Sequence, residues 1–221
     1  MWGVIGFGFA ALVFAFFAFT VQKELIKKSE HFNSKHFAIG MYIAAGACLL
    51  WAIAALLNSS SALSASIIVG DVLLVAATLY ILNAWISDEN RWPAIVGVGL
   101  VGIFFVLARI FIFTPNAYMR DGLLFLNTPR LLAALLVVMF FSIWFIANYR
   151  FFKIVSERLR IIPGIGQITY IFNIAAFVGI CGFLIARKPL TIVISFITFT
   201  LCYLFLTYVV IVARKEALHH G

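Results

Sequence analysis

The sequence has few charged residues. Of its 221 residues, 8 are Asp or Glu and 16 are Lys or Arg; charged residues make up 11% of the chain and hydrophobic residues 65%. Soluble globular domains carry about 25% charged and about 45–50% apolar residues. A soluble core of this size cannot bury so many apolar side chains, so the composition excludes an ordinary water-soluble protein.

Residues that carry chemistry inside membranes are also scarce. His31, His36, His219 and His220 all lie outside the middle of the long apolar segments. A buried haem or chlorophyll would need such a histidine as its axial ligand. Asp71 is the one aspartate within an apolar segment, so the paired aspartates of intramembrane proteases are missing. We therefore expect no enzymatic activity and no cofactor.

The three cysteines give no sign of a disulfide framework or a metal site. Cys48, Cys181 and Cys202 are far apart in the sequence, and no histidine lies near any of them. Their positions inside apolar segments are typical of small, polarisable packing residues. No metal is expected.

What the chain does have is long apolar segments. About 20 apolar residues in a helix span the hydrocarbon core of a bilayer, which is about 30 Å thick. The sequence predicts one domain, residues 1–221, that is an all-α integral membrane protein with a seven-transmembrane-helix bundle. The predicted spans are residues 2–22, 36–58, 66–87, 93–114, 129–151, 165–186 and 190–212.

The basic residues between these segments predict an orientation. Lys and Arg in short connections are retained on the cytoplasmic side of a membrane. The second, fourth and sixth connections, with the start of the fifth segment, carry only Arg120, Arg130, Arg187 and Lys188, and most of the other basic residues lie on the opposite side. We therefore expect the N-terminus outside, the C-terminus in the cytoplasm, and location in the cytoplasmic (plasma) membrane. The net charge of +8 is then a topology signal, and no nucleic-acid partner is expected.

A glycine pattern in the fourth segment has the spacing of a dinucleotide-binding motif. Gly97, Gly99 and Gly102 spell G-x-G-x-x-G. That motif requires a preceding strand and an exposed helix N-terminus, whereas these glycines lie within an apolar segment. They are better explained as small residues that allow helices to pack closely.

A second pattern resembles a known family over about ten residues. Arg120, Thr128 and Pro129 are similar in spacing to the third helix of microbial rhodopsins. Here the pattern precedes the fifth segment, and Leu123 stands where that family has its counter-ion carboxylate. Retinal also requires a lysine within the bundle, and no apolar segment has one in its core. The sequence predicts no retinal pigment.

Two charged residues lie about five residues inside the ends of apolar segments. Asp71 is near the outer end of the third segment, and Arg109 is near the outer end of the fourth. Successive helices joined by short connections are antiparallel neighbours, so the two side chains should lie at the same depth. Each would then neutralise the other. A purely structural ion pair is one interpretation, and a ligand site is the other.

The connection between the fourth and fifth segments adds polar residues above this pair. Arg120, Asp121 and Asn127 lie in it, and Arg130 follows it. These side chains could cap an outward-opening pocket with Asp71 and Arg109 at its floor. Such a pocket would suit a small anionic or zwitterionic ligand. Arginines that reach the lipid headgroups explain Arg120 and Arg130 equally well.

A second polar group is expected nearer the cytoplasm. Tyr80 and Asn83 lie near the inner end of the third segment, and Gln167, Tyr170 and Asn173 recur every three residues in the sixth. Interhelical hydrogen bonds of this kind hold membrane bundles together. If the same side chains faced water, they would suit a transport path.

These features leave three functions open. A receptor- or sensor-like module would bind a ligand at the outer charged residues and act through a separate protein partner in the membrane or the cytoplasm. A structural or assembly subunit would pack its 24 Phe side chains against other subunits or the lipid bilayer. A small-solute transporter or channel would need a further polar site deeper in the bundle.

Overall fold

The computed structural model describes residues 2–25, 33–85, 88–127, 129–159, 163–185 and 187–219. Its elements, in chain order, are α1 (Trp2–Leu25), α2 (Ser34–Leu57), α3 (Ser60–Trp85), α4 (Asp88–Phe111), β1 (Asn116–Arg120), β2 (Leu123–Asn127), α5 (Arg130–Leu135), η1 (Leu136–Phe141), α6 (Ser142–Leu159), α7 (Pro163–Leu184) and α8 (Pro189–His219).

The helices agree with the apolar segments of the sequence. Six of them are long and apolar enough to cross a membrane, and α7 adds a shorter apolar stretch, Thr169–Leu184. A helix satisfies its backbone hydrogen bonds internally, which is why long apolar runs fold this way in lipid. The predicted all-α membrane-type bundle is therefore supported, while the count of seven spans and their orientation remain predictions.

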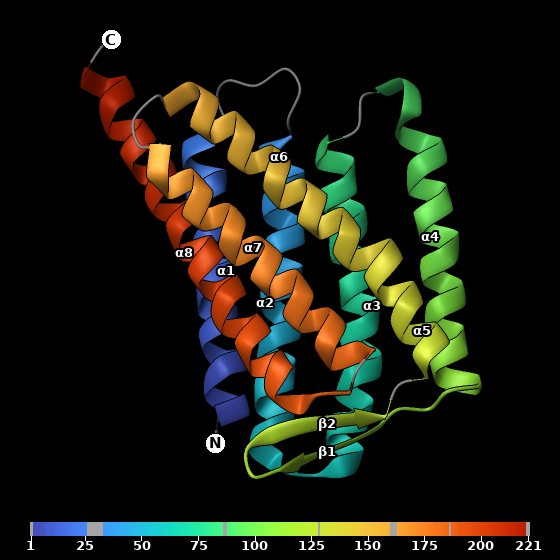
Figure 1. The fold of residues 1–221 in the computed structure, drawn as a ribbon. Coiled ribbons are helices and arrows are strands. Elements are labelled where there is room, and N and C mark those ends of the chain that lie inside the picture. The colour runs from blue at the N-terminus through green and yellow to red at the C-terminus, as the bar shows by residue number, and fades with distance from the viewer. Residues whose placement is uncertain are drawn as a thin grey trace.

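The helices pack around one another so that the last helix of the chain contacts the first. The first three pack against one another in chain order, α8 returns to pack against both α1 and α7, and α6 contacts α3, α7 and α8. Helix α4 lies at one edge of the bundle, against α3 (Figure 1). This arrangement brings the first and last helices of the chain side by side.

Aromatic side chains fill much of the core. Near the end of the bundle where α8 ends, the rings of Phe37 and Phe151 stack at 5.2 Å, and Phe17 lies 5.4 Å from Phe151 in an edge-to-face contact. Towards the other end, Phe105 and Phe140 lie 5.7 Å apart. Such ring pairs add to the stability gained from burial alone.

The connection after α4 is a β-hairpin, which the sequence analysis did not predict. The strands are antiparallel, with Asn116 paired to Asn127 and Arg120 paired to Leu123. Asp121 and Gly122 form the turn with positive φ angles of 54° and 78°. Positive φ at both positions matches a type I′ turn, for which Asp-Gly is a preferred sequence.

The hairpin lies across the end of the bundle where α1 begins (Figure 1). At its tip, the N–H of Gly3 donates a hydrogen bond to the Gly122 carbonyl at 3.1 Å. At its base, the N–H of Ala117 donates to Ser64 Oγ of α3 at 3.1 Å. The hairpin therefore caps this end and connects α1 with α3.

The helix that follows the hairpin contains a π-helical segment. In η1, between α5 and α6, the hydrogen bonds follow the i to i−5 pattern: both the N–H and the hydroxyl of Ser142 donate to the Val137 carbonyl. A short π segment of this kind inserts one residue into an α-helix and often marks a functional position.

Glycines allow close contacts between helices at some positions only. Gly102 of α4 lies against Val75 of α3, which agrees with the predicted packing role, whereas Gly97 and Gly99 face open space. Gly40 of α2 lies directly against Ala77 and Ile81 of α3. The contact at Gly40 sets the distance between these two helices.

Replacing Gly40 with Ala should destabilise the bundle. The added methyl group would lie 2.8 Å from Ile81 Cγ1 and 3.0 Å from the Ala77 carbonyl oxygen. Overpacking of this kind costs about 1–3 kcal/mol, so thermal unfolding in detergent should occur at a lower temperature. Gly46→Ala on the same helix is the control, because a methyl group there meets nothing within 4 Å. Equal unfolding temperatures for the two variants would contradict the close α2–α3 contact.

Candidate functional site

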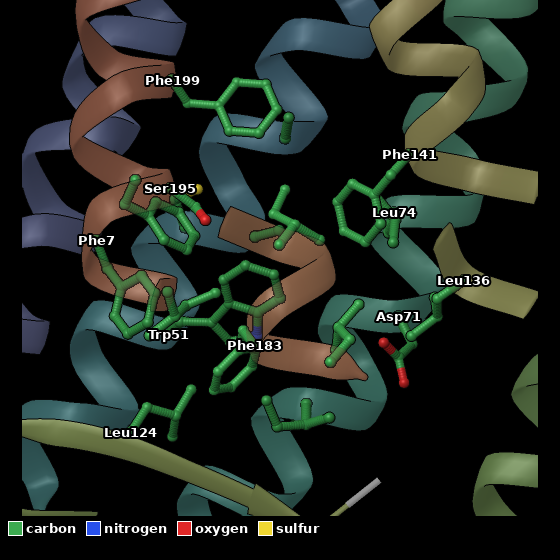
Figure 2. A pocket seen from close by; sticks show the side chains of 18 of the residues that line it. Phe7, Trp51, Asp71, Leu74, Leu124, Leu136, Phe141, Phe183, Ser195 and Phe199 are labelled. Carbon is green, nitrogen blue, oxygen red and sulfur yellow. The ribbon is translucent and has the colours of Figure 1, made fainter. Parts of the chain in front are cut away.

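The bundle contains a cavity of about 140 Å³ close to the hairpin. Figure 2 shows Phe7, Trp51 and Ser195 on one side of it and Asp71, Leu136 and Phe141 on the other. Nearly all of its wall is aromatic or aliphatic, with further side chains from Leu74, Leu124, Leu126, Trp144, Phe183, Phe196 and Phe199. The cavity therefore collects residues from every part of the chain.

An aromatic cluster forms one wall of the cavity. The rings of Phe7 and Phe196 meet edge to face at 4.8 Å, and Phe7 lies 5.8 Å from Trp51. The indole N–H of Trp51 donates to the Ser66 carbonyl at 3.1 Å. Because this bond holds the indole in place, Trp51 presents ring carbons to the cavity.

Asp71 and Arg109 supply the charge in the cavity wall. Arg109 Nε donates to Asp71 Oδ2 at 2.9 Å. The Arg109 side chain is 1% exposed and that of Asp71 is 9% exposed. The guanidinium carbon of Arg109 also lies 5.8 Å from the ring centre of Phe105. The predicted contact between α3 and α4 is thus present, and it is buried.

The polar residues of the fourth connection lie elsewhere. Arg120 and Asp121 sit at the hairpin turn, with side chains 73% and 88% exposed, and pair with each other at 3.7 Å. Asn127 and Arg130 are also exposed. The hairpin contributes Leu124 and Leu126 to the cavity wall. The six residues that the sequence grouped in one pocket therefore fall into a buried pair and four surface residues.

A buried polar cluster joins α6, α7 and α8. The Tyr203 hydroxyl donates to Asn148 Oδ1 at 2.7 Å, and Asn148 Nδ2 donates to Asn173 Oδ1 at 3.2 Å. Asn173 Nδ2 in turn donates to the Phe145 carbonyl at 3.2 Å. Sequence reasoning named Asn173 but missed Asn148 and Tyr203. The signal available for Asn148 was an amide within an apolar segment, which is costly in lipid unless it is hydrogen-bonded.

The other members of the predicted inner group do not join this cluster. Tyr80 and Tyr170 are partly exposed, and Asn83 is half-buried on α3. The Tyr170 ring lies 5.6 Å from that of Tyr149. The side chain of Gln167 lies outside the described residues. The group is therefore spread over α3 and α7.

Another hydrogen bond links α6 to the cavity wall. The indole N–H of Trp144 donates to Thr78 Oγ1 of α3 at 2.9 Å. The Thr78 hydroxyl donates to the Leu74 carbonyl at 2.7 Å. Trp144 and Leu74 both line the cavity. The indole of Trp144, like that of Trp51, therefore has its donor satisfied by the protein.

The cysteines do not gather into a site. Cys48 and Cys202 are buried, and Cys181 is half-buried. The Cys202 thiol lies 3.7 Å from the Thr169 carbonyl, which it contacts as a weak donor. Among the residues that the structure describes, no three His, Cys, Asp or Glu side chains form a group that could hold a metal ion.

Comparison with known protein families, with characterised proteins and with solved structures finds no match to this chain.

Removing one partner of the buried ion pair should destabilise the protein. Arg109→Ala leaves the Asp71 carboxylate buried without its counter-charge, which costs about 3–5 kcal/mol in buried pairs. The double variant Asp71→Leu/Arg109→Met should recover most of this loss, because apolar residues of similar size replace both charges. Thermal unfolding in detergent measures each effect.

Arg120→Ala is the control for this experiment. Arg120 belongs to an exposed pair, and such pairs contribute little to stability. Arg109→Ala and Arg120→Ala should therefore unfold at clearly different temperatures. If they unfold together, the Asp71–Arg109 pair does not stabilise the fold.

Proposed function

We propose that this protein is a receptor-like membrane protein that binds a small, largely apolar ligand in the cavity and acts through a separate protein partner. The observation that carries the proposal is the cavity itself, which measures about 140 Å³ and is lined by residues from α1 to α8 and by two leucines of the hairpin. Concave, mostly apolar sites with a few polar groups are typical of small-molecule binding.

The wall of the cavity favours a ligand less charged than the one expected from the sequence. Asp71 and Arg109 neutralise each other, and the rest of the lining is almost entirely apolar. A small anion placed there would lose its hydration and gain no unpaired positive charge. A mostly apolar molecule would exchange water for aromatic contacts.

A path for the signal runs along the helix that follows the hairpin. Leu136 and Phe141 of η1 line the cavity, and so does Trp144 at the start of α6. One turn beyond Trp144, Asn148 holds α7 and α8 through Asn173 and Tyr203. A change of one residue in the register of η1 would rotate the following helix by about 100°. Ligand contact at η1 would therefore alter the hydrogen bonds at Asn148.

The proposal includes seven spans, with the N-terminus outside and the C-terminus in the cytoplasm. The distribution of basic residues supports this orientation. The N-terminus and the end of α8 lie at opposite ends of the bundle, as an odd number of spans requires (Figure 1). With the protein in the plasma membrane, the hairpin would then lie on the outer side of the cell.

Labelling of introduced cysteines tests the orientation. A membrane-impermeant maleimide should label Tyr118→Cys on β1 in intact cells, whereas Lys153→Cys on α6 should react only after permeabilisation. Both positions are exposed. The unsubstituted chain gives the background from its own three cysteines. The reverse labelling pattern would overturn the orientation.

Ligand binding is tested by purifying the protein from the membranes of its native host in mild detergent and extracting bound small molecules. One compound should accompany the unsubstituted chain and be lost from Ala47→Phe, because Ala47 lines the cavity and the added ring would fill it. Gly46→Phe is the control, since its side chain would point into open space. It should retain the compound.

Other outcomes would favour the other functions. Stoichiometric co-purification with larger subunits, unchanged in Ala47→Phe, would favour a structural or assembly subunit. Solute flux into liposomes that contain the purified protein would favour a transporter. Equal amounts of the compound in Ala47→Phe and Gly46→Phe would contradict binding in the cavity.

A further inference from the structure

The size of the cavity limits its ligand. A cavity of about 150 Å³ with aliphatic and aromatic walls holds one benzene molecule in another protein, where it was made by removing a side chain. The cavity here measures about 140 Å³ and has similar walls. It therefore has room for one ring.

The walls also favour an aromatic ring. Phe7, Trp51 and Phe196 already meet edge to face in one wall. An aromatic ligand beside them would extend the same arrangement, in which ring edges contact ring faces.

The polar atoms that line the cavity are mostly satisfied by the protein. The indole N–H groups of Trp51 and Trp144 donate to Ser66 and Thr78, respectively. The hydroxyl of Ser195 donates to the Thr191 carbonyl at 2.7 Å. These three side chains therefore have no further donor to offer a ligand.

Asp71 is different, because only part of its carboxylate is used. Oδ2 accepts the hydrogen bond from Arg109, and Oδ1 accepts none from the residues that the structure describes. The Asp71 side chain lines the cavity and keeps 9% of its surface exposed. A ligand that supplies a donor to Oδ1 would gain a hydrogen bond to a charged acceptor, which is stronger than one between neutral groups.

From these observations we infer the class of ligand: a single-ring aromatic molecule that carries one hydrogen-bond donor, such as a phenolic hydroxyl or a ring N–H, which it gives to Asp71 Oδ1. The inference rests on the proposed function, since it names the ligand of the same cavity. The donor would sit beside Asp71 and Leu136, and the ring would extend towards Trp51 (Figure 2).

A matched pair of fluorinated probes tests the inference. 4-Fluorophenol carries the donor, and fluorobenzene has the same ring without it. Fluorine NMR of the protein purified in detergent measures the affinity of each, with Ala47→Phe as the control for partition into the micelle. The phenol should bind at least about tenfold more tightly, as expected for a hydrogen bond to a charged group.

The double variant Asp71→Leu/Arg109→Met assigns this preference to the carboxylate. It removes both charges together, so no unpaired charge is left to disturb the fold. In the double variant the preference should disappear, so that the affinities for 4-fluorophenol and fluorobenzene become equal. If the preference persists in the double variant, Asp71 is not the acceptor and the inference fails.

The outcomes separate the inference from the proposed function. Equal affinity of the unsubstituted protein for both probes, abolished in Ala47→Phe, would overturn the requirement for a donor and leave the cavity as a binding site. Binding of neither probe would overturn the single-ring class. The proposed function would then be judged by the compound that co-purifies with the protein.

Discussion

The hydrogen bond between Arg109 and Asp71 is the interaction on which the packing of α4 against α3 depends. Helix α4 lies at the edge of the bundle and presents large apolar side chains such as Trp92, Leu100 and Phe104 outwards. Lipid solvates those side chains as well as a neighbouring helix would, so apolar burial alone gives α4 little reason to stay against α3. A buried pair of opposite charges keeps α4 against α3, because neither charge can be exposed to lipid at low cost. The pair thus holds α4 in place and completes the wall of the cavity.

The cavity follows from how the other polar groups are arranged. The polar side chains around it bond to neighbours within the bundle: Trp51 to α3, Trp144 to Thr78, and Ser195 to its own helix. The wall of the cavity is therefore mostly carbon, interrupted by the Asp71–Arg109 pair. The proposed receptor-like function depends on this contrast, since an apolar wall accepts many small molecules and a few polar atoms select among them.

The helices and the Asp71–Arg109 contact could be predicted from the sequence, whereas the hairpin and η1 were not. Apolar length predicts helices, because lipid leaves few alternatives for the backbone. The contact between Asp71 and Arg109 could be predicted because short connections make α3 and α4 antiparallel neighbours. The hairpin was missed although Asp121-Gly122 is a strong turn signal. The segment η1 could not have been foreseen, because one extra residue in a continuous apolar helix leaves no mark on hydropathy. The hairpin places Arg120 and Asp121 at its exposed turn, away from Asp71 and Arg109. Because the hairpin was not predicted, the sequence analysis wrongly grouped these four residues in one pocket.

The hairpin connects helices that are distant in the sequence. Strand β1 packs against α3, and β2 packs against α8 and α1, while the turn is hydrogen-bonded to Gly3. These four contacts hold the ends of α1, α3 and α8 at fixed separations. A bundle that is held together at one end can rearrange most freely at the other end. In the proposed function, a change that starts in the cavity would therefore be transmitted away from the hairpin, towards the far ends of α6, α7 and α8.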